Sequence, residues 1–191
     1  MPLPRAYVTI VSGAPRSGTS MMMRMLERGG LAPLMDGIRA ADRDNPQGYY
    51  EFEPVKRTKA DASWVPAAAG RAVKMVHVLL RDLPAGPEFR VVLMRRKVEE
   101  MVASQRRMLE RLGRDAGKLP DERVAQIFTA QLDETEKWLE GRPGFAWQRM
   151  DYNALLAAPR EHLDRLSAFL DGLDVAAMET VVDKDLYRNR T

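Results

Sequence analysis

The sequence AYVTIVSGAPRSGTS, residues 6–20, decides the fold of this chain. Its first half, residues 6–12, carries β-branched and aromatic side chains and no charge, which is typical of a strand buried on both faces of a parallel sheet. Residues 13–18 interrupt this pattern. From Thr19 onward apolar residues recur at helical spacing, and Gly29-Gly30 ends the helix. We therefore predict a strand, a glycine-bearing loop and a helix in succession.

The rest of the chain alternates in the same way. Apolar runs predict strands at residues 72–78, 89–94 and 145–150. Helical spacing predicts helices at 97–112 and 120–140, a weakly patterned helix at 55–69, and two short helices separated at Pro159. Strands that alternate with helices indicate an α/β fold with a mainly parallel sheet, and the length fits a single domain over residues 1–191.

Composition narrows the class of partner. The formal net charge is +3 in 191 residues, a mild basic excess that suits an anionic small molecule at least as well as nucleic acid, so we expect no nucleic-acid partner. Cysteine is absent, which excludes disulfides and thiolate metal sites, and no residues have metal-ligand spacing. There is no secretory signal and no apolar run near ~18 residues, so we expect a cytoplasmic protein without a membrane partner.

The loop after the first strand has the chemistry of an anion site. At a strand–helix junction, free backbone N–H groups and the positive end of the helix dipole converge, and glycines let the backbone wrap an oxyanion. Hydroxyls add neutral donors, and a guanidinium adds a charged fork. We therefore predict that the nucleotide-binding residues of this loop are Ala14, Pro15, Arg16, Ser17, Gly18, Thr19 and Ser20.

The loop differs from that of nucleoside-triphosphate-binding proteins. The glycine spacing of G-x-x-x-x-G-K-[ST] is kept between Gly13 and Gly18, but Thr19 stands where the lysine should reach the β- and γ-phosphates. The cation lies inside the loop, at Arg16. This arrangement is poorly suited to ATP or GTP chemistry and suits one phosphate that carries a further small anionic group.

The string GAPRSGTS, in this position, resembles the 5′-phosphosulfate loop of sulfotransferases, in the Pro-Arg-Ser-Gly-Thr-Thr/Ser form of tyrosylprotein and many bacterial members. Cytosolic sulfotransferases have lysine at the position matched by Arg16. The resemblance implies a P-loop-like, three-layer fold and 3′-phosphoadenylyl sulfate (PAPS) as donor, with adenosine 3′,5′-bisphosphate (PAP) as product and no metal. It further implies that Arg16 is catalytic and stabilises the oxygen that bridges the sulfur and the 5′-phosphate as this oxygen becomes anionic.

A second segment resembles the same family. There an arginine at a strand end and a serine eight positions later hold the 3′-phosphate, and Arg96 and Ser104 have this spacing. Arg95 is one residue out of register and is a candidate to share the binding of the 3′-phosphate. Lys97 stands where the family often has a proline.

The resemblance is weaker elsewhere. It includes the segment NPQGYYE, residues 45–51, and Met150-Asp151-Tyr152. Arg188 or Arg190 is a candidate substitute for the Arg-Lys-Gly loop of cytosolic sulfotransferases.

Sulfuryl transfer to a hydroxyl or amine requires a proton acceptor. Glu51 is one candidate, because it follows a turn that can aim it at the site, and Glu53 and Asp36 lie in the same region. His77 is the rival, in a sequence that partly resembles the Lys-Thr-His-Leu-Pro segment of cytosolic sulfotransferases.

The sulfuryl acceptor and the oligomeric state cannot be read from the sequence. The alternatives are a P-loop-type nucleotide or small-molecule kinase, or a non-catalytic PAP-binding or nucleotide-binding protein.

Overall fold

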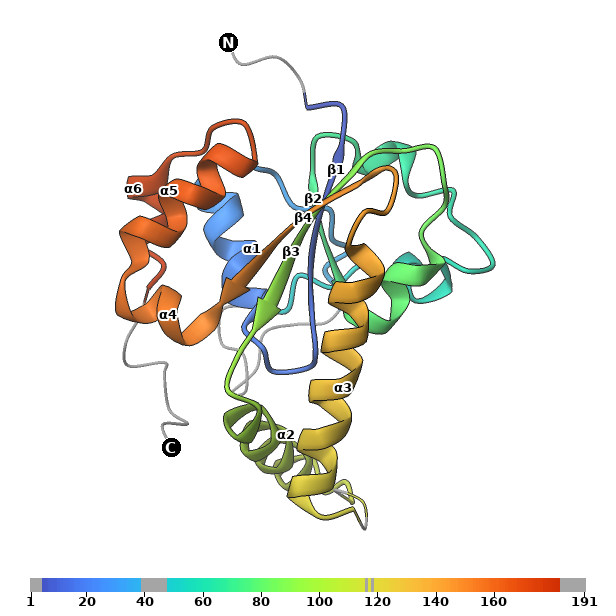
Figure 1. Cartoon of the computed structure of the whole chain (residues 1–191), viewed down its shortest axis with the longest axis vertical. Coiled ribbons are helices and arrows are strands. Elements are labelled where there is room, and N and C mark those ends of the chain that lie inside the picture. Colours follow the sequence, from blue (N-terminus) through green and yellow to red (C-terminus); the bar gives the residue numbers. More distant parts are fainter. Residues whose placement is uncertain (1–4, 39–47, 116, 118, 183–191) are drawn as a thin grey trace.

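The computed structural model describes residues 5–38, 48–115, 117 and 119–182, and shows an α/β fold (Figure 1). Three short 3₁₀ helices, labelled η, interrupt the alternation of strands and α-helices. The elements in chain order are β1 (Val8–Gly13), α1 (Thr19–Arg28), η1 (Glu53–Arg57), η2 (Pro66–Ala68), β2 (Ala72–Val76), η3 (His77–Asp82), β3 (Phe89–Arg95), α2 (Val98–Arg111), α3 (Asp121–Leu139), β4 (Phe145–Asp151), α4 (Tyr152–Ala157), α5 (Pro159–Phe169) and α6 (Val175–Glu179).

The central sheet has the order β2-β1-β3-β4, and all neighbouring strands in it are parallel. The chain moves from β1 to β2 on one side and then returns to β3 on the other side of β1. Such a reversal of strand order opens a crevice at the carboxyl ends of the two strands, where ligands bind in open α/β sheets. In this sheet the crevice lies beyond Gly13 and Met94, which are paired in register.

Helices cover both faces of the sheet (Figure 1). On one face α1, α4, α5 and α6 pack with Val11 and Val92 of the sheet. On the other face α3 and the 3₁₀ segments pack with Ile10 and Val91. Successive residues of a strand point to opposite faces, so a strand covered on both faces buries all of its side chains and carries no charge. This explains why every residue of β1 is buried and uncharged. The arrangement confirms the predicted α/β fold with a parallel sheet between helices.

One predicted element is wrong. The helix expected over residues 55–69 is replaced by η1 and η2, which are separated by turns. Pro54 and Pro66 each stand near the start of one of these short segments, where a missing N–H is tolerated, but Pro66 would remove a hydrogen bond from the middle of a continuous helix. The strand predicted over 72–78 is also shorter, because the chain turns into η3 at His77.

Charged side chains tie α3 to the carboxyl ends of β3 and β4. Glu136 of α3 accepts from Arg149 Nε at 2.9 Å and lies 3.1 Å from Arg95 Nε, and Arg95 also pairs with Asp133. The Glu136 side chain is only 9 % exposed, so its charge depends on these guanidinium groups.

No helix within the described ranges is long and apolar enough to cross a lipid bilayer.

We expect Glu136→Ala to lower the free energy of unfolding by about 2 kcal/mol, because it leaves two guanidinium groups without their shared partner. The matched control is Glu134→Ala, two residues away on the same helix. Glu134 is 67 % exposed and lies 3.8 Å from Arg81, so its loss should cost at most about 0.5 kcal/mol. Urea denaturation measures both, and equal losses would show that the buried pairs do not hold α3.

Candidate functional site

The loop between β1 and α1 adopts a backbone that glycine permits. Gly18 has φ 96° and ψ 13°, in the left-handed region, and is the residue immediately before α1. A Cβ on Gly13 would lie 2.4 Å from Ser17 Oγ and 3.0 Å from the carbonyl oxygen of Met94, which leaves no room for one. Arg16 also has a positive φ of 69°, which is strained for a residue with a side chain.

This loop geometry presents donors to an anion. The first N–H groups of a helix have no partner inside the helix, and α1 begins directly after the loop at Thr19. The Ser17 side chain is fully buried, and its hydroxyl has no hydrogen-bond partner in the described part of the chain. Because buried hydroxyls are nearly always hydrogen-bonded, an unpaired one beside a helix N-terminus fits a site for a ligand oxyanion.

The two segments identified from the sequence meet at Arg16. Its Nε donates to Ser104 Oγ at 2.9 Å, and its carbonyl oxygen accepts from Arg96 Nη1 at 3.2 Å. Arg16 and Arg96 are 80 residues apart in the chain, yet they meet at the carboxyl ends of β1 and β3. The predicted nucleotide-binding residues of both segments are therefore brought together.

Arg96 is held by Glu100 and Tyr152 in addition to the Arg16 carbonyl oxygen. Its Nε lies 2.9 Å from Glu100 Oε2, and its guanidinium carbon lies 4.5 Å from the centre of the Tyr152 ring. Glu100 is fully buried and also accepts from Asn153 Nδ2 at 3.0 Å. A buried carboxylate is tolerated when hydrogen-bonded donors surround it, and here those donors also fix the direction of Arg96.

Tyr152, the first residue of α4, packs on both segments. A Cβ added to Gly18 would lie 2.4 Å from a ring carbon of Tyr152, so the ring covers the loop at this point. The ring also lies against the Arg96 guanidinium. Burial raises the pKa of the Tyr152 hydroxyl, which therefore stays protonated near neutral pH. The aromatic ring sets the spacing between the glycine loop and the arginine.

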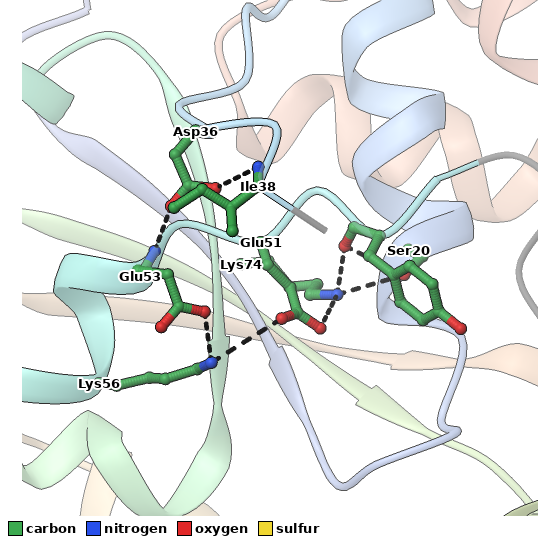
Figure 2. A network of polar contacts seen from close by, with 8 residues as sticks. Ser20, Asp36, Ile38, Glu51, Glu53, Lys56 and Lys74 are labelled. Atoms are coloured by element: carbon green, nitrogen blue, oxygen red, sulfur yellow. Dashed lines mark hydrogen bonds and ion pairs between the residues drawn. The ribbon is translucent and has the colours of Figure 1, made fainter. Parts of the chain in front are cut away.

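Glu51 lies close to the start of α1 through a lysine that the sequence did not single out. Lys74 Nζ is 4.0 Å from Glu51 Oε1 and donates to Ser20 Oγ at 3.3 Å and to the Tyr49 carbonyl (Figure 2). Lys56 lies 4.0 Å from the other Glu51 oxygen. Lys74 is the one charge in β2, so a charged residue inside an apolar strand was the available signal.

The two neighbouring acidic candidates are engaged differently. Asp36 accepts from the backbone N–H of Glu53 at 2.6 Å and of Ile38 at 3.0 Å. The hydrogen bond from Glu53 chiefly holds the pKa of Asp36 below its usual range, which makes Asp36 a weaker proton acceptor. The Glu53 side chain pairs with Lys56, on the side away from Ser20 (Figure 2).

His77 lies beside the beginning of the loop in a buried position. The ring is 2 % exposed, with Nδ1 3.2 Å from the Gly13 carbonyl oxygen and Nε2 3.2 Å from Gln131 Oε1 of α3. Burial is the main cause that lowers the pKa of His77, so the imidazole is neutral near pH 7. His77 is thus near the predicted site, with both ring nitrogens in contact with other groups.

Other sequence candidates lie elsewhere. Arg95 points to α3, where it pairs with Asp133 and Glu136, so it does not share the surface formed by Arg96 and Ser104. Trp64, in the segment between η1 and η2, is buried and donates from Nε1 to Thr58 Oγ1. Arg188 and Arg190 lie outside the described residues. Within the described ranges, no group of three or more His, Cys, Asp or Glu side chains is arranged to hold a metal ion.

Comparisons with known proteins identify the fold. No family model and no curated protein sequence matches the chain. Among solved structures, the sulfotransferase domain from the curacin biosynthetic pathway is similar with TM-score 0.57 and 17 % identity, over 97 % of this chain and 80 % of that one. The sulfotransferase domain of the Synechococcus PCC 7002 olefin synthase has TM-score 0.57 and 16 % identity, over 98 % and 82 %. A sulfotransferase from Alicyclobacillus acidocaldarius has TM-score 0.51 and 13 % identity, over 96 % and 97 %.

These likenesses show that the chain has the P-loop-like fold found in sulfotransferases. At such identities the shared fold does not by itself carry over an activity. Function has to be argued from the loop, from Arg96 and Ser104, and from the acidic residues near α1.

We expect Gly18→Ala to destabilise the protein by about 3 kcal/mol, because alanine is strained at this φ and its methyl group overlaps the Tyr152 ring. Gly30→Ala is a matched control. Gly30 has φ 94° and open space where a Cβ would lie, so only the backbone cost of about 1 kcal/mol remains. Thermal or urea denaturation of both variants measures the difference, and an equal loss would contradict the packing of Tyr152 on the loop.

Proposed function

We propose that the protein is a sulfotransferase that moves a sulfuryl group from PAPS to a hydroxyl or amine of an acceptor. The observation that carries the proposal is the meeting of two basic anion-binding segments at Arg16. Ser104 contacts its side chain and Arg96 its carbonyl oxygen, at 2.9 Å and 3.2 Å. A donor with a 5′-phosphosulfate and a 3′-phosphate has anions at two separate positions, which matches two segments better than one. The fold shared with sulfotransferase domains supports the same conclusion.

The residues present fit such a donor. The glycines at 13 and 18 let the loop pack against Met94 and Tyr152, and the buried Ser17 hydroxyl is available to an oxyanion. The donor would supply an activated sulfuryl group bonded through oxygen to its 5′-phosphate. We assign the loop residues and the N-terminus of α1 to the phosphosulfate, and Arg96 and Ser104 to the 3′-phosphate.

The proposed reaction is a direct in-line transfer. An acceptor oxygen or nitrogen forms a bond to sulfur while the bond from sulfur to the bridging oxygen breaks, and the 5′-phosphate leaves with the electron pair. Arg16 and the N–H groups at the start of α1 stabilise the charge that develops on that leaving oxygen. No metal is required, because the arginine and the helix terminus supply the positive charge.

Glu51 is the better placed of the two proposed bases. It lies 4.0 Å from Lys74, which donates to Ser20 of the first turn of α1. A general base must reach the proton it accepts, directly or through one water. The Glu51 side chain is 21 % exposed, whereas His77 is 2 % exposed and contacts protein groups through both ring nitrogens. We therefore propose Glu51 as the proton acceptor and retain His77 as the alternative.

A kinase is the alternative that a specific contact favours. Lys74 brings an ammonium group to Ser20, although it comes from β2 and not from the loop position that Thr19 occupies. That ammonium is close enough to the start of α1 to reach a phosphate bound there. Binding of ATP and transfer of its terminal phosphate distinguish this alternative from sulfuryl transfer.

Calorimetric titration of the protein with PAP, ATP and AMP tests the donor site. We expect PAP to bind most tightly, and Arg16→Ala to weaken it by about 10- to 100-fold, since charged hydrogen bonds contribute about 1.5–3 kcal/mol each. Arg96→Ala is combined with Glu100→Gln so that no uncompensated carboxylate is left buried, and a similar loss is expected. Arg123→Ala, an exposed arginine in the first turn of α3, is the control.

Equal or absent binding of the three nucleotides would refute the proposal. A preference for ATP would replace it with the kinase. Tight binding of PAP without transfer to any acceptor, from a panel of phenols, alcohols, sugars and amines, would indicate a non-catalytic PAP-binding protein.

Glu51→Gln is expected to reduce transfer from labelled PAPS by at least about 100-fold, the usual contribution of a general base, while PAP affinity stays unchanged. Glu53→Gln is the matched control, because Glu53 is two residues away and its side chain pairs with Lys56. Retention of activity in Glu51→Gln would exclude Glu51 as the base. Loss of activity in Glu53→Gln alone would assign the role to Glu53.

A further inference from the structure

His77 is placed by the sheet beside the first peptide of the loop. The parallel ladder between β1 and β2 ends with the pair Gly13 and Val76, and His77 is the next residue along the chain. Beyond this pair the backbones of the two strands diverge. The His77 side chain then makes the contact that a further backbone pair would have made, with Nδ1 at 3.2 Å from the Gly13 carbonyl oxygen.

The protonation state of the ring follows from its neighbours. A carbonyl oxygen only accepts, so Nδ1 of the buried, neutral imidazole carries the proton and Nε2 is left as an acceptor. Gln131 Oε1 lies 3.2 Å from Nε2, and a half-turn of this amide, whose two ends are nearly equivalent in shape, would bring its NH₂ group to Nε2 as the donor. In that orientation Gln131 selects the tautomer with the proton on Nδ1.

The direction of the Gly13 carbonyl matters for an anion. A carbonyl dipole that points into the loop would repel a bound oxyanion, whereas one that points outward leaves the N–H groups facing it. The hydrogen bond from His77 favours the outward orientation. Gly13 has no Cβ to restrict this peptide, and its φ of 155° is one that residues with a side chain rarely adopt.

We propose that His77 is a positioning residue that holds the Gly13 peptide of the anion-binding loop, and that Gln131 of α3 holds the imidazole for this task. The inference rests on the proposed function, in which the loop binds the 5′-phosphosulfate. It gives His77 a role in donor binding in place of proton transfer. It also connects α3, which the ion pairs of Glu136 fasten to the sheet, with the nucleotide site.

The test compares two ligands that differ only at the 5′ position, PAP and adenosine 3′-monophosphate. His77→Leu removes the donor and should weaken PAP by about ten-fold, the effect of leaving one buried carbonyl unpaired. Binding of adenosine 3′-monophosphate should not change, because it does not use the loop. His77→Asn should restore PAP affinity, since the asparagine amide nitrogen lies near the position of Nδ1. His162→Leu, at the other histidine, on α5, is the control.

A double-mutant cycle isolates the part played by Gln131. Gln131→Leu should weaken PAP in the wild-type background and have no effect in the His77→Asn background, where no Nε2 remains for Gln131 to contact. Unchanged PAP affinity in His77→Leu, an equal loss of both ligands in a folded variant, or failure of His77→Asn to restore binding would each overturn the inference.

Hydrogen exchange separates this inference from the proposed function. We expect the backbone amides of Gly13, Ala14, Arg16 and Ser17 to exchange faster in His77→Leu than in the wild type, and at the wild-type rate in His77→Asn. Absence of nucleotide binding in the wild type would refute the proposed function alone. Unchanged exchange in His77→Leu would refute the positioning role.

Discussion

The site depends on the contacts that Arg16 makes with the segment after β3. Its side chain donates to Ser104 and its carbonyl oxygen accepts from Arg96, so one residue of the glycine loop is fixed from both of its ends. A hydrogen bond from a charged donor contributes about 1.5–3 kcal/mol to stability, and these two hold a backbone with positive φ that would otherwise relax. Without them the loop and the β3–α2 junction would be two separate basic segments.

Buried charge makes this arrangement rigid. Glu100 has no exposed surface, and removing a carboxylate from water costs several kcal/mol unless donors surround it. Arg96 and Asn153 are those donors, and both gain a fixed direction in return. Tyr152 then fills the space between Arg96 and Gly18, so that Glu100 of α2 and two segments distant in the sequence, the loop and the start of α4, restrain one guanidinium group.

The opposite side of the loop is supported through α3. Arg95 and Arg149 fasten this helix to the ends of β3 and β4, and Gln131 of the same helix contacts His77 under the loop. The partly exposed network of Glu51, Lys74 and Lys56 lies at the remaining side, next to Ser20. A buried histidine and a partly exposed carboxylate therefore take different positions around the same loop, and only the second faces solvent.

The sequence by itself determined the α/β class and the strand–loop–helix unit at residues 6–28, because hydrophobic periodicity and glycine placement are local properties. The loop was linked to Arg96 and Ser104 through the resemblance to sulfotransferases. It assigned Arg96 and left Arg95 as a candidate to share its role, and it placed a helix at 55–69 where two 3₁₀ segments stand. Only the tertiary structure decided these points. Arg95 and Arg96 are adjacent at the end of β3, so their side chains point in opposite directions. Arg95 reaches α3 and Arg96 reaches the loop, and this depends on which elements cover each face of the sheet. The contacts of Gln131 with His77 and of Glu100 with Asn153 likewise join distant segments, which a single sequence does not encode in any local pattern. For Lys74 the local signal was a charge inside an apolar strand, which does not say what that charge contacts.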